Sequence, residues 1–289
     1  MPGGDPPPPP PRSLLVIRNV LKLWLLLTGL CGLLGAAGWA LGGYRLLSVF
    51  AFGGALLAAA VYWSADRVVT GMVGARELLP AEAPALHSTV ERLAMRAQVV
   101  KPRIYLLPDG FPRALGGGRG GAGAVLALSA GFLAAASPAE LEGVLAHEIA
   151  HLRHRDVLLQ TVAVVLATTL VELTRLGGWL QRALLFVVGP VAAAFVHLLL
   201  SPAREFAADR LAASLCESPH GLADALLRLE QASDLVEFRA NAMTEPLYTV
   251  NPFAEEGVSK LFATHPSVAE RVRRLRGLDP GWHEKLRAA

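Results

Sequence analysis

SPAELEGVLAHEIAH, residues 137–151, is the stretch of sequence that decides the predicted fold. It begins as a helix should: Ser137 can cap the first turn, Pro138 takes the first helical position, and Glu140 can complete a capping box. The pattern predicts one helix that runs from residue 137 through residue 155. His147 and His151 stand four positions apart on this helix, so their side chains lie on the same face.

The pentapeptide HEIAH, residues 147–151, predicts a metal site on that helix. Two histidines one turn apart can bind a single ion, and Zn²⁺ is the ion that this spacing favours. Glu148 projects beside the same face, where it can accept a proton from a water molecule without being a ligand. We therefore expect one Zn²⁺ per chain, with His147 and His151 as ligands and Glu148 as general base.

A catalytic zinc normally takes three protein ligands, so a third one must come from elsewhere in the chain. The HExxHxxGxxH arrangement is excluded, because His154 stands where glycine is required and Val157 where the third histidine is required. The inverted motif HxxEH is also absent. A downstream carboxylate remains, and Glu205 fits because Asp209 follows it one helical turn later. We expect Glu205 to bind the metal and Asp209 to orient one of the histidines.

Two other acidic residues compete with Glu205 for the role of third ligand. Glu172 would lie some 30 Å from His151 if the helix continued straight, which is too far. Glu217 stands just before Ser218-Pro219, at a helix end where its carboxylate would be solvated. His154 is expected to be a solvated or headgroup-level residue, and His197 a packed or interfacial residue; neither is expected to be a ligand.

The composition is that of a membrane protein. Hydrophobic residues make up 53% of the 289 residues, and the mean hydropathy is +0.42. The formal net charge is only +3, without a long run of like charge, which excludes a nucleic-acid-binding arm. The two cysteines, Cys31 and Cys216, form no metal-binding or disulfide pattern.

Four uncharged segments are candidates for membrane spans: residues 23–44, 46–65, 157–171 and 183–203. The predicted fold class is therefore a mainly α membrane protein. About four transmembrane helices would accompany an α+β zinc peptidase domain, with a small edge sheet before the HExxH helix. The third segment is short, so the second pair could instead form an apolar lid over the site.

These segments divide the chain into five predicted regions. They are a disordered proline-rich tail (1–13), two transmembrane helices (14–79), a first part of the peptidase domain (80–156), a hydrophobic hairpin (157–200) and a second part with the third ligand (201–289). Within the peptidase parts we expect strands at 104–107 and 124–128, a flexible Gly-rich hairpin loop at 116–123, and helices at 85–98, 203–216, 219–232 and 266–276.

Arginine and lysine flank the predicted spans unevenly. They gather before the first span, after the second, before the third and after the fourth, while the short connecting loops hold only Arg45, and Arg175 with Arg182. By the positive-inside rule, the peptidase parts face the cytoplasm.

The order of the motifs resembles the HtpX and type I CAAX prenyl protease group of integral-membrane zinc endopeptidases. The resemblance rests on HEIAH followed by HRD (154–156), on SPAREFAAD (201–209), and on THP (264–266) leading to Glu270-Arg271. It implies a gluzincin-like α+β zinc peptidase domain, with His147, His151 and Glu205 on zinc and Glu148 as base. It also implies His265 or Arg271 as the donor to the oxyanion; alternatively, His265 only starts the last helix and Arg271 pairs with a carboxylate.

The resemblance also implies a partner and a location. The expected substrates are polypeptides, above all unfolded or misassembled membrane proteins, and the expected location is the bacterial inner membrane with its lipid bilayer. One position departs from the group, because Arg113-Ala114-Leu115 stands where Asn-Ala-Phe is usual. A catalytically impaired zinc-binding adaptor of the same fold is therefore the alternative. A transporter or scaffold with an accidental HEIAH is a more distant one.

Overall fold

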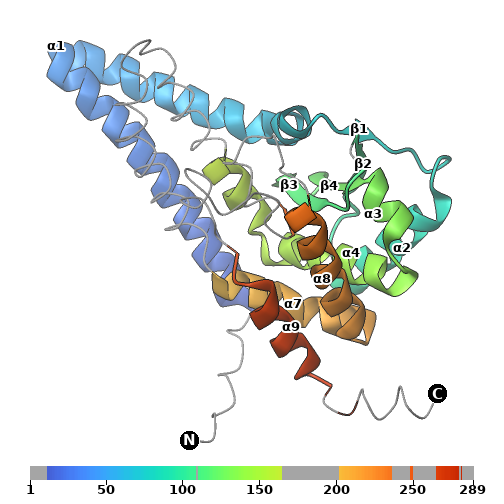
Figure 1. Cartoon of the computed structure of the whole chain (residues 1–289). Helices are drawn as coiled ribbons and strands as arrows, with labels where there is room; N and C mark the ends of the chain where they lie inside the picture. Colours follow the sequence, from blue (N-terminus) through green and yellow to red (C-terminus); the bar gives the residue numbers. More distant parts are fainter. Residues whose placement is uncertain are drawn as a thin grey trace, which may run out of the picture.

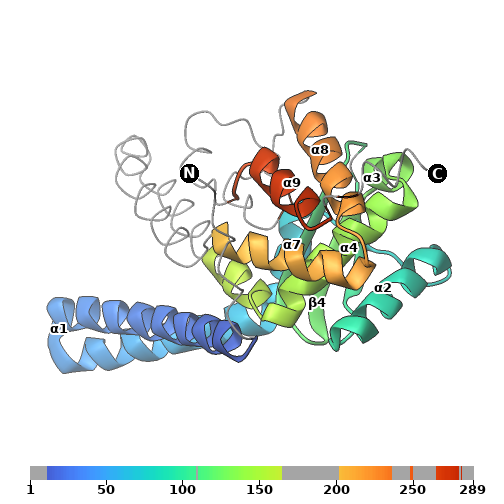
Figure 2. The same ribbon diagram turned by 90° about the horizontal axis from the view of Figure 1, so that it is seen from below.

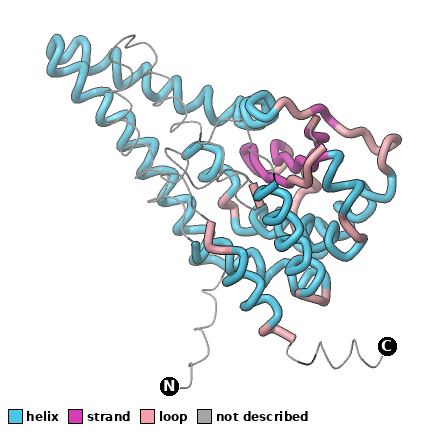
Figure 3. The backbone as a smooth tube through the Cα atoms, viewed as in Figure 1, coloured by secondary structure: helices cyan, strands magenta, loops and turns pink. Residues whose placement is uncertain are grey.

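The computed structural model describes residues 12–108, 110–164, 202–235, 248–249, 265–279 and 281. A long helical hairpin projects from a body in which a small sheet lies among helices (Figure 1; Figure 3). Residues 1–11 of the predicted tail lie outside the described residues, as do 165–200 of the predicted hydrophobic hairpin, including Glu172 and His197.

The helical hairpin is α1, Arg12–Val73, which already begins within the predicted tail. It is broken at Gly42 and Gly43, where Gly43 has φ +64°, a conformation that glycine adopts without strain. The two arms meet at the far tip and diverge toward the body (Figure 1; seen from below in Figure 2). The break separates the two apolar segments predicted from the sequence.

Among the residues that the structure describes, no helix is both long enough and apolar enough to cross a membrane. The spans predicted at 23–44 and 46–65 stay predictions.

A mixed four-stranded sheet follows α1. Its strands are β1 (Arg76–Glu77), β2 (Arg103–Leu107), β3 (Ala114–Gly120) and β4 (Gly123–Ser129), in the order β1-β2-β4-β3. β2 and β4 are parallel, and the other neighbours are antiparallel. The structure thus confirms the two predicted strands and the mainly helical fold with a small sheet.

The prediction of a flexible loop at 116–123 was wrong. Most of this segment belongs to the edge strand β3, and only Gly121 and Ala122 form the turn to β4. The glycines serve close packing: a Cβ at Gly116 would lie 2.2 Å from Oε2 of Glu148, and one at Gly118, where φ is +91°, would lie 2.2 Å from the carbonyl oxygen of Gly123. At these two positions glycine allows close packing, whereas at Gly120 and Gly121, with φ +78° and +55°, it allows the left-handed backbone at the turn.

Both faces of the sheet are buried at β2 and β4, because alternate residues of these strands enter different cores. Leu126 and Leu128 of β4 join the main core with the helices, whereas Val125 and Ala127 face a smaller cluster that includes Val164. This explains why β4 is apolar at almost every position.

The helix that carries HEIAH is the centre of the body. This helix, α4 (Pro138–His154), begins as predicted: Ser137 Oγ accepts from the amide of Glu140, and Glu140 Oε2 accepts from the amide of Ser137 at 2.7 Å. It ends at Arg155, which adopts the left-handed conformation with φ +55°. The neighbouring helices are α2 (Pro84–Ala97), α3 (Ala130–Ala135), α7 (Pro202–Cys216), α8 (His220–Leu235) and α9 (Val268–Arg276).

α4 packs against α2, α7 and α8, so its side chains are buried on several sides (Figure 1). The four helices predicted at 85–98, 203–216, 219–232 and 266–276 are all present, with ends that differ by no more than three residues. The last one begins at Val268 and not at Pro266, because Ser267 caps it by accepting from the amide of Glu270.

Candidate active site

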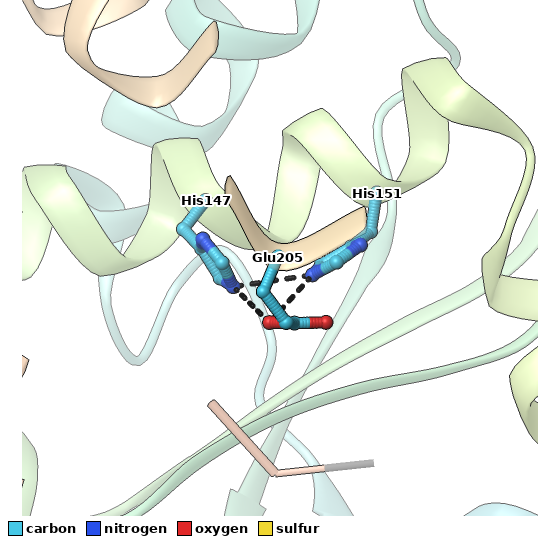
Figure 4. Close-up of side chains that lie close together, drawn as sticks. All are labelled: His147, His151 and Glu205. Carbon is cyan, nitrogen blue, oxygen red and sulfur yellow. Dashed lines mark hydrogen bonds and ion pairs between the residues drawn. The ribbon is translucent and has the colours of Figure 1, made fainter. Parts of the chain in front are cut away.

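Three side chains meet beneath α4 (Figure 4). His147 and His151 come from successive turns of this helix, and Glu205 comes from the first turn of α7. The Nε2 atoms of the two histidines are 3.1 Å apart. Oε2 of Glu205 lies 3.5 Å from Nε2 of His147 and 3.6 Å from Nε2 of His151. The structure therefore brings together the three ligands predicted from the sequence.

These three atoms fit one small metal ion. Ligands at zinc distances of about 2.0–2.2 Å in a tetrahedral arrangement lie roughly 3.3 Å from one another, close to the separations observed. Glu205 is buried, and its Oε2 has no hydrogen-bond partner among the described residues, whereas its Oε1 accepts from Arg204 Nη2 at 3.0 Å. A buried carboxylate oxygen without a partner is costly, and a cation at this point would satisfy it.

Each ligand histidine is held by a carboxylate through its other ring nitrogen. Asp209 Oδ1 lies 3.0 Å from Nδ1 of His147, and Asp156 Oδ2 lies 3.0 Å from Nδ1 of His151. This arrangement fixes both rings with Nε2 toward the metal position. Asp209 occupies the position that the sequence predicts for it.

The sequence analysis assigned no role to Asp156. Its placement depends on the end of α4, where Arg155 reverses the chain and the amide of Asp156 donates to the carbonyl of His151 at 3.3 Å. The signals available were its position five residues after the second histidine and its place in the HRD segment, residues 154–156.

Arg271 of α9 is fully buried beside the histidines. Its Nε and Nη2 donate to the two oxygens of Asp209 at 2.9 and 2.7 Å, and its Nη1 donates to the carbonyl of Thr249 at 2.7 Å. These contacts support the alternative interpretation of Arg271, in which it pairs with a carboxylate, over a direct contact with the reacting group.

His265 lies at the edge of the same cluster. Its Nε2 is 3.6 Å from Oε2 of Glu205, and its side chain is almost completely buried. It precedes α9 without capping it, since Ser267 has that role. His265 is therefore positioned beside the metal ligands, as its predicted role requires.

Glu148 is buried on the side of α4 that faces β3. Thr249 Oγ1 donates to its Oε1 at 2.6 Å, while its Oε2 packs against Gly116. Thr249 is itself anchored to β3, because its amide donates to the carbonyl of Ala114 at 3.0 Å. No motif marks Thr249, which lies 101 residues from Glu148 in the sequence.

Opposite charges set the protonation of the buried groups. Burial alone lowers the pKa of His151, but the carboxylates of Asp156 and Glu205 outweigh it and raise the pKa to about 10. Burial raises the pKa of Asp209, but the Arg271 guanidinium outweighs this effect and lowers it to about 2. The pKa of Glu205 is held well below its usual range by His265, His151 and Arg204, against the effect of burial. These effects keep Glu205 and Asp209 ionised.

The remaining candidates lie outside the cluster. Glu217, at the end of α7, is exposed and pairs with Arg96 at 3.2 Å, as expected for a solvated residue. The expectation that His154 is solvated was wrong: it is buried, and burial lowers its pKa to about 4. Arg113 is buried immediately before β3, and its amide donates to Ser129 Oγ at 2.9 Å.

Comparison with known proteins gives consistent matches. The family model described as peptidase family M48 matches residues 80–279. Proteins named protease HtpX homolog are similar over most of their length. The homolog from Pelotomaculum thermopropionicum is 34% identical, in an alignment that covers 90% of this chain and 99% of the homolog. The homolog from Persephonella marina is 36% identical, in an alignment that covers 89% of this chain and 96% of the homolog. The crystal structure of S. mikatae Ste24p matches with 18% identity and a TM-score of 0.49, over 91% of this chain and 66% of that one.

Proposed function

Because the chain belongs to peptidase family M48 and is a metalloprotease, we propose that it hydrolyses peptide bonds with one Zn²⁺ held by His147, His151 and Glu205. Family membership confirms the resemblance stated from the motifs. The observation that carries the proposal is the convergence of two Nε2 atoms on a buried carboxylate oxygen that has no hydrogen-bond partner among the described residues. Thiolate ligands are absent from this set, and histidine with carboxylate is typical of catalytic zinc.

Zinc, when bound, acts as a Lewis acid on the peptide carbonyl and on water. Glu148 accepts the proton of the attacking water and returns it to the leaving amine. The Thr249 hydroxyl holds Oε1 of Glu148, which leaves Oε2 to carry the proton. Asp209 and Asp156 keep both histidine rings in the orientation that binds the metal.

The oxyanion that forms on the substrate needs a hydrogen-bond donor beside the ligands. We assign this role to His265, whose Nε2 lies 3.6 Å from Glu205. Arg271 acts through Asp209 and not on the substrate, because its guanidinium already binds both oxygens of Asp209. It positions Asp209, which in turn orients His147.

We also propose that the protease works at a lipid bilayer, with α1 in contact with lipid. Many large apolar side chains of α1 are exposed, among them Trp24 at 61%, Leu25 at 63% and Trp63 at 67%. Exposed apolar surface of this extent is typical of a membrane or protein contact. The arginine pattern of the sequence supports a bacterial inner-membrane protein with its site on the cytoplasmic side. At that position the protease would cleave unfolded or misassembled membrane proteins.

The alternative function is a zinc-binding adaptor with impaired catalysis. The observation that favours it is Arg113, which replaces the asparagine usual in the resembling group and is buried at the start of the edge strand. The substrate contact expected from that asparagine is then missing.

One variant separates these possibilities. In Glu148→Gln the amide cannot accept a proton, while His147, His151 and Glu205 are unchanged. We expect the purified protein in detergent to retain one zinc per chain and to lose cleavage of an unfolded polypeptide that the wild-type protein cleaves. Cleavage at the wild-type rate by Glu148→Gln would remove Glu148 from the mechanism. A wild-type protein that binds zinc without cleaving would support the adaptor, and one that binds no zinc would refute both functions.

The location has its own test. After replacement of Cys31 and Cys216, a cysteine at position 45, at the tip of α1, should react with a membrane-impermeant reagent from outside intact cells. Cysteines at the exposed positions 91 and 273 of the body should react only after the membrane is opened. Labelling of position 91 or 273 in intact cells would contradict the proposed orientation.

A further inference from the structure

A cavity of about 460 Å³ lies where the base of α1 meets the body of the protein. Asn19, Val20, Leu23 and Tyr62 of α1 form one wall. The other walls come from the turn between β3 and β4, the end of α4 and residues 157–159. None of these lining residues is part of the metal site, so the cavity needs a separate explanation.

The cavity is positively charged. Arg119, Arg153 and Arg155 line it, and none of the described lining residues is acidic. Within the described part of the chain, the side chains of Arg119 and Arg155 make no hydrogen bond or ion pair, in contrast to body arginines such as Arg92, which pairs with Glu142 at 2.7 Å. Three guanidinium groups around one cavity, without a counter-charge in its walls, create a field that attracts an anion.

The rest of the lining is largely apolar. Val20 and Leu23 contribute from α1, and Leu158 and Leu159 from the segment after α4. Leu21 and Trp24, next to these α1 residues in the sequence, are 55% and 61% exposed. A ligand that matches the whole cavity therefore has an anionic group at one end and apolar chains at the other.

We propose that this cavity binds an acidic phospholipid. Arg119 and Arg155 hold the phosphate, since the planar guanidinium matches phosphate oxygens with two parallel hydrogen bonds. The acyl chains lie along Val20 and Leu23 and continue over the exposed apolar side chains of α1. A soluble phosphate compound would use the arginines but leave the apolar wall uncovered.

The position of the cavity gives this lipid a structural role. Asn19 Nδ2 donates to the carbonyl of His154 at 3.2 Å, which joins the base of α1 to the last residue of α4. The bound lipid contacts both sides of this joint, because α1 and the end of α4 each line the cavity. It thus fixes the HExxH helix relative to α1 without contact with the metal ligands.

The test measures lipid binding and does not depend on proteolysis or on the proposed metal. Full-length protein in a zwitterionic detergent is titrated with phosphatidylglycerol, with phosphatidylcholine and with glycerol 3-phosphate, and bound ligand is counted by native mass spectrometry. We expect phosphatidylglycerol to bind about tenfold or more tightly than phosphatidylcholine, because the two phosphates carry the same charge but the cavity arginines repel the choline ammonium of phosphatidylcholine. Glycerol 3-phosphate should bind far more weakly than the lipid.

Matched variants locate the site. Arg119→Gln/Arg155→Gln should lose the preference for phosphatidylglycerol, whereas Arg45→Gln/Arg273→Gln, which removes the same charge from exposed positions outside the cavity, should keep it. Val20→Trp changes no charge but fills the apolar end, and should also weaken lipid binding. Unchanged binding in the cavity double variant, or in Val20→Trp, would overturn the proposal. Glycerol 3-phosphate that binds as tightly as the lipid would overturn the assignment of a phospholipid.

Discussion

The helices α4 and α1 distribute their side chains in opposite ways. α4 buries charged and polar residues: His147 is 0% exposed, Glu148 4% and His151 2%. α1 exposes large apolar residues such as Trp24 and Leu25, at 61% and 63%. The burial of polar groups in α4 is costly, and partners from distant parts of the chain offset that cost.

This difference predicts where substitutions matter. Each polar group of the α4 site depends on one or two partners, so the loss of a single partner leaves a buried group unsatisfied. The exposed face of α1 offers apolar surface but makes no specific contact with the site. Single changes on this face should therefore leave zinc binding unaffected.

The carboxylates behind the histidines should have the largest effect. Asp209→Asn should weaken zinc binding about 10 to 100-fold, because an amide orients His147 less well and leaves Arg271 without its charge partner. Asp156→Asn should act similarly through His151. Zinc affinity is measured by competition with a chelator, and Asp224→Asn, at an exposed ion pair, is the control. Wild-type affinity in Asp209→Asn would remove it from the site.

Thr249 should affect the reaction but not the metal. Thr249→Val removes the donor to Oε1 of Glu148 and should lower kcat about tenfold or more, because a hydrogen bond to a buried charged group is lost. Thr249→Ser keeps the hydroxyl and should restore most of the rate. Zinc content should equal that of the wild-type protein in both. Equal kcat values for the valine and serine variants would contradict a role of the hydroxyl.

Zinc binding should release protons at neutral pH. The pKa of His151 in the metal-free site is raised to about 10, so this histidine carries a proton at pH 7 that must leave before Nε2 can bind zinc. The apparent zinc affinity should therefore rise with pH up to about pH 10, and not level off near the usual histidine pKa of about 6.5. Calorimetry in buffers with different ionisation enthalpies measures the release. Affinity that is constant from pH 7 upward would contradict the raised pKa.

Changes on α1 should affect the site least. Trp24→Gln removes an exposed apolar side chain and should leave zinc content and kcat on a soluble unfolded polypeptide unchanged. Its partition into phospholipid vesicles should fall modestly, since roughly 2 kcal/mol of apolar transfer free energy is lost at most. Loss of zinc in Trp24→Gln would mean that α1 and the site are not independent.

Local patterns predicted the elements that depend on a few neighbouring residues. The cap of α4, the histidine spacing and the helix that carries Glu205 and Asp209 follow from residues within one or two turns of one another. Elimination among the acidic residues then selected Glu205 from a separate part of the chain.

Contacts between distant segments were not predictable in this way. Thr249 reaches Glu148 only because residues 248–249 pair with β3, which no periodicity indicates. The glycines of β3 suggested a loop, although one of them, Gly116, makes room for the carboxylate of Glu148. The need for that space was not visible in the local sequence, because Glu148 belongs to another element. Arg271 was recognised as a site residue, but only the structure shows that its guanidinium binds Asp209.

The central claim is that Glu205 completes the metal site of α4 from another part of the chain. The most direct test is the zinc content of purified Glu205→Ala, compared with Glu217→Ala, which removes an exposed carboxylate from the end of the same helix. We predict a sharp loss of zinc in Glu205→Ala and one zinc per chain in Glu217→Ala. Full zinc occupancy together with full proteolysis in Glu205→Ala would contradict the account.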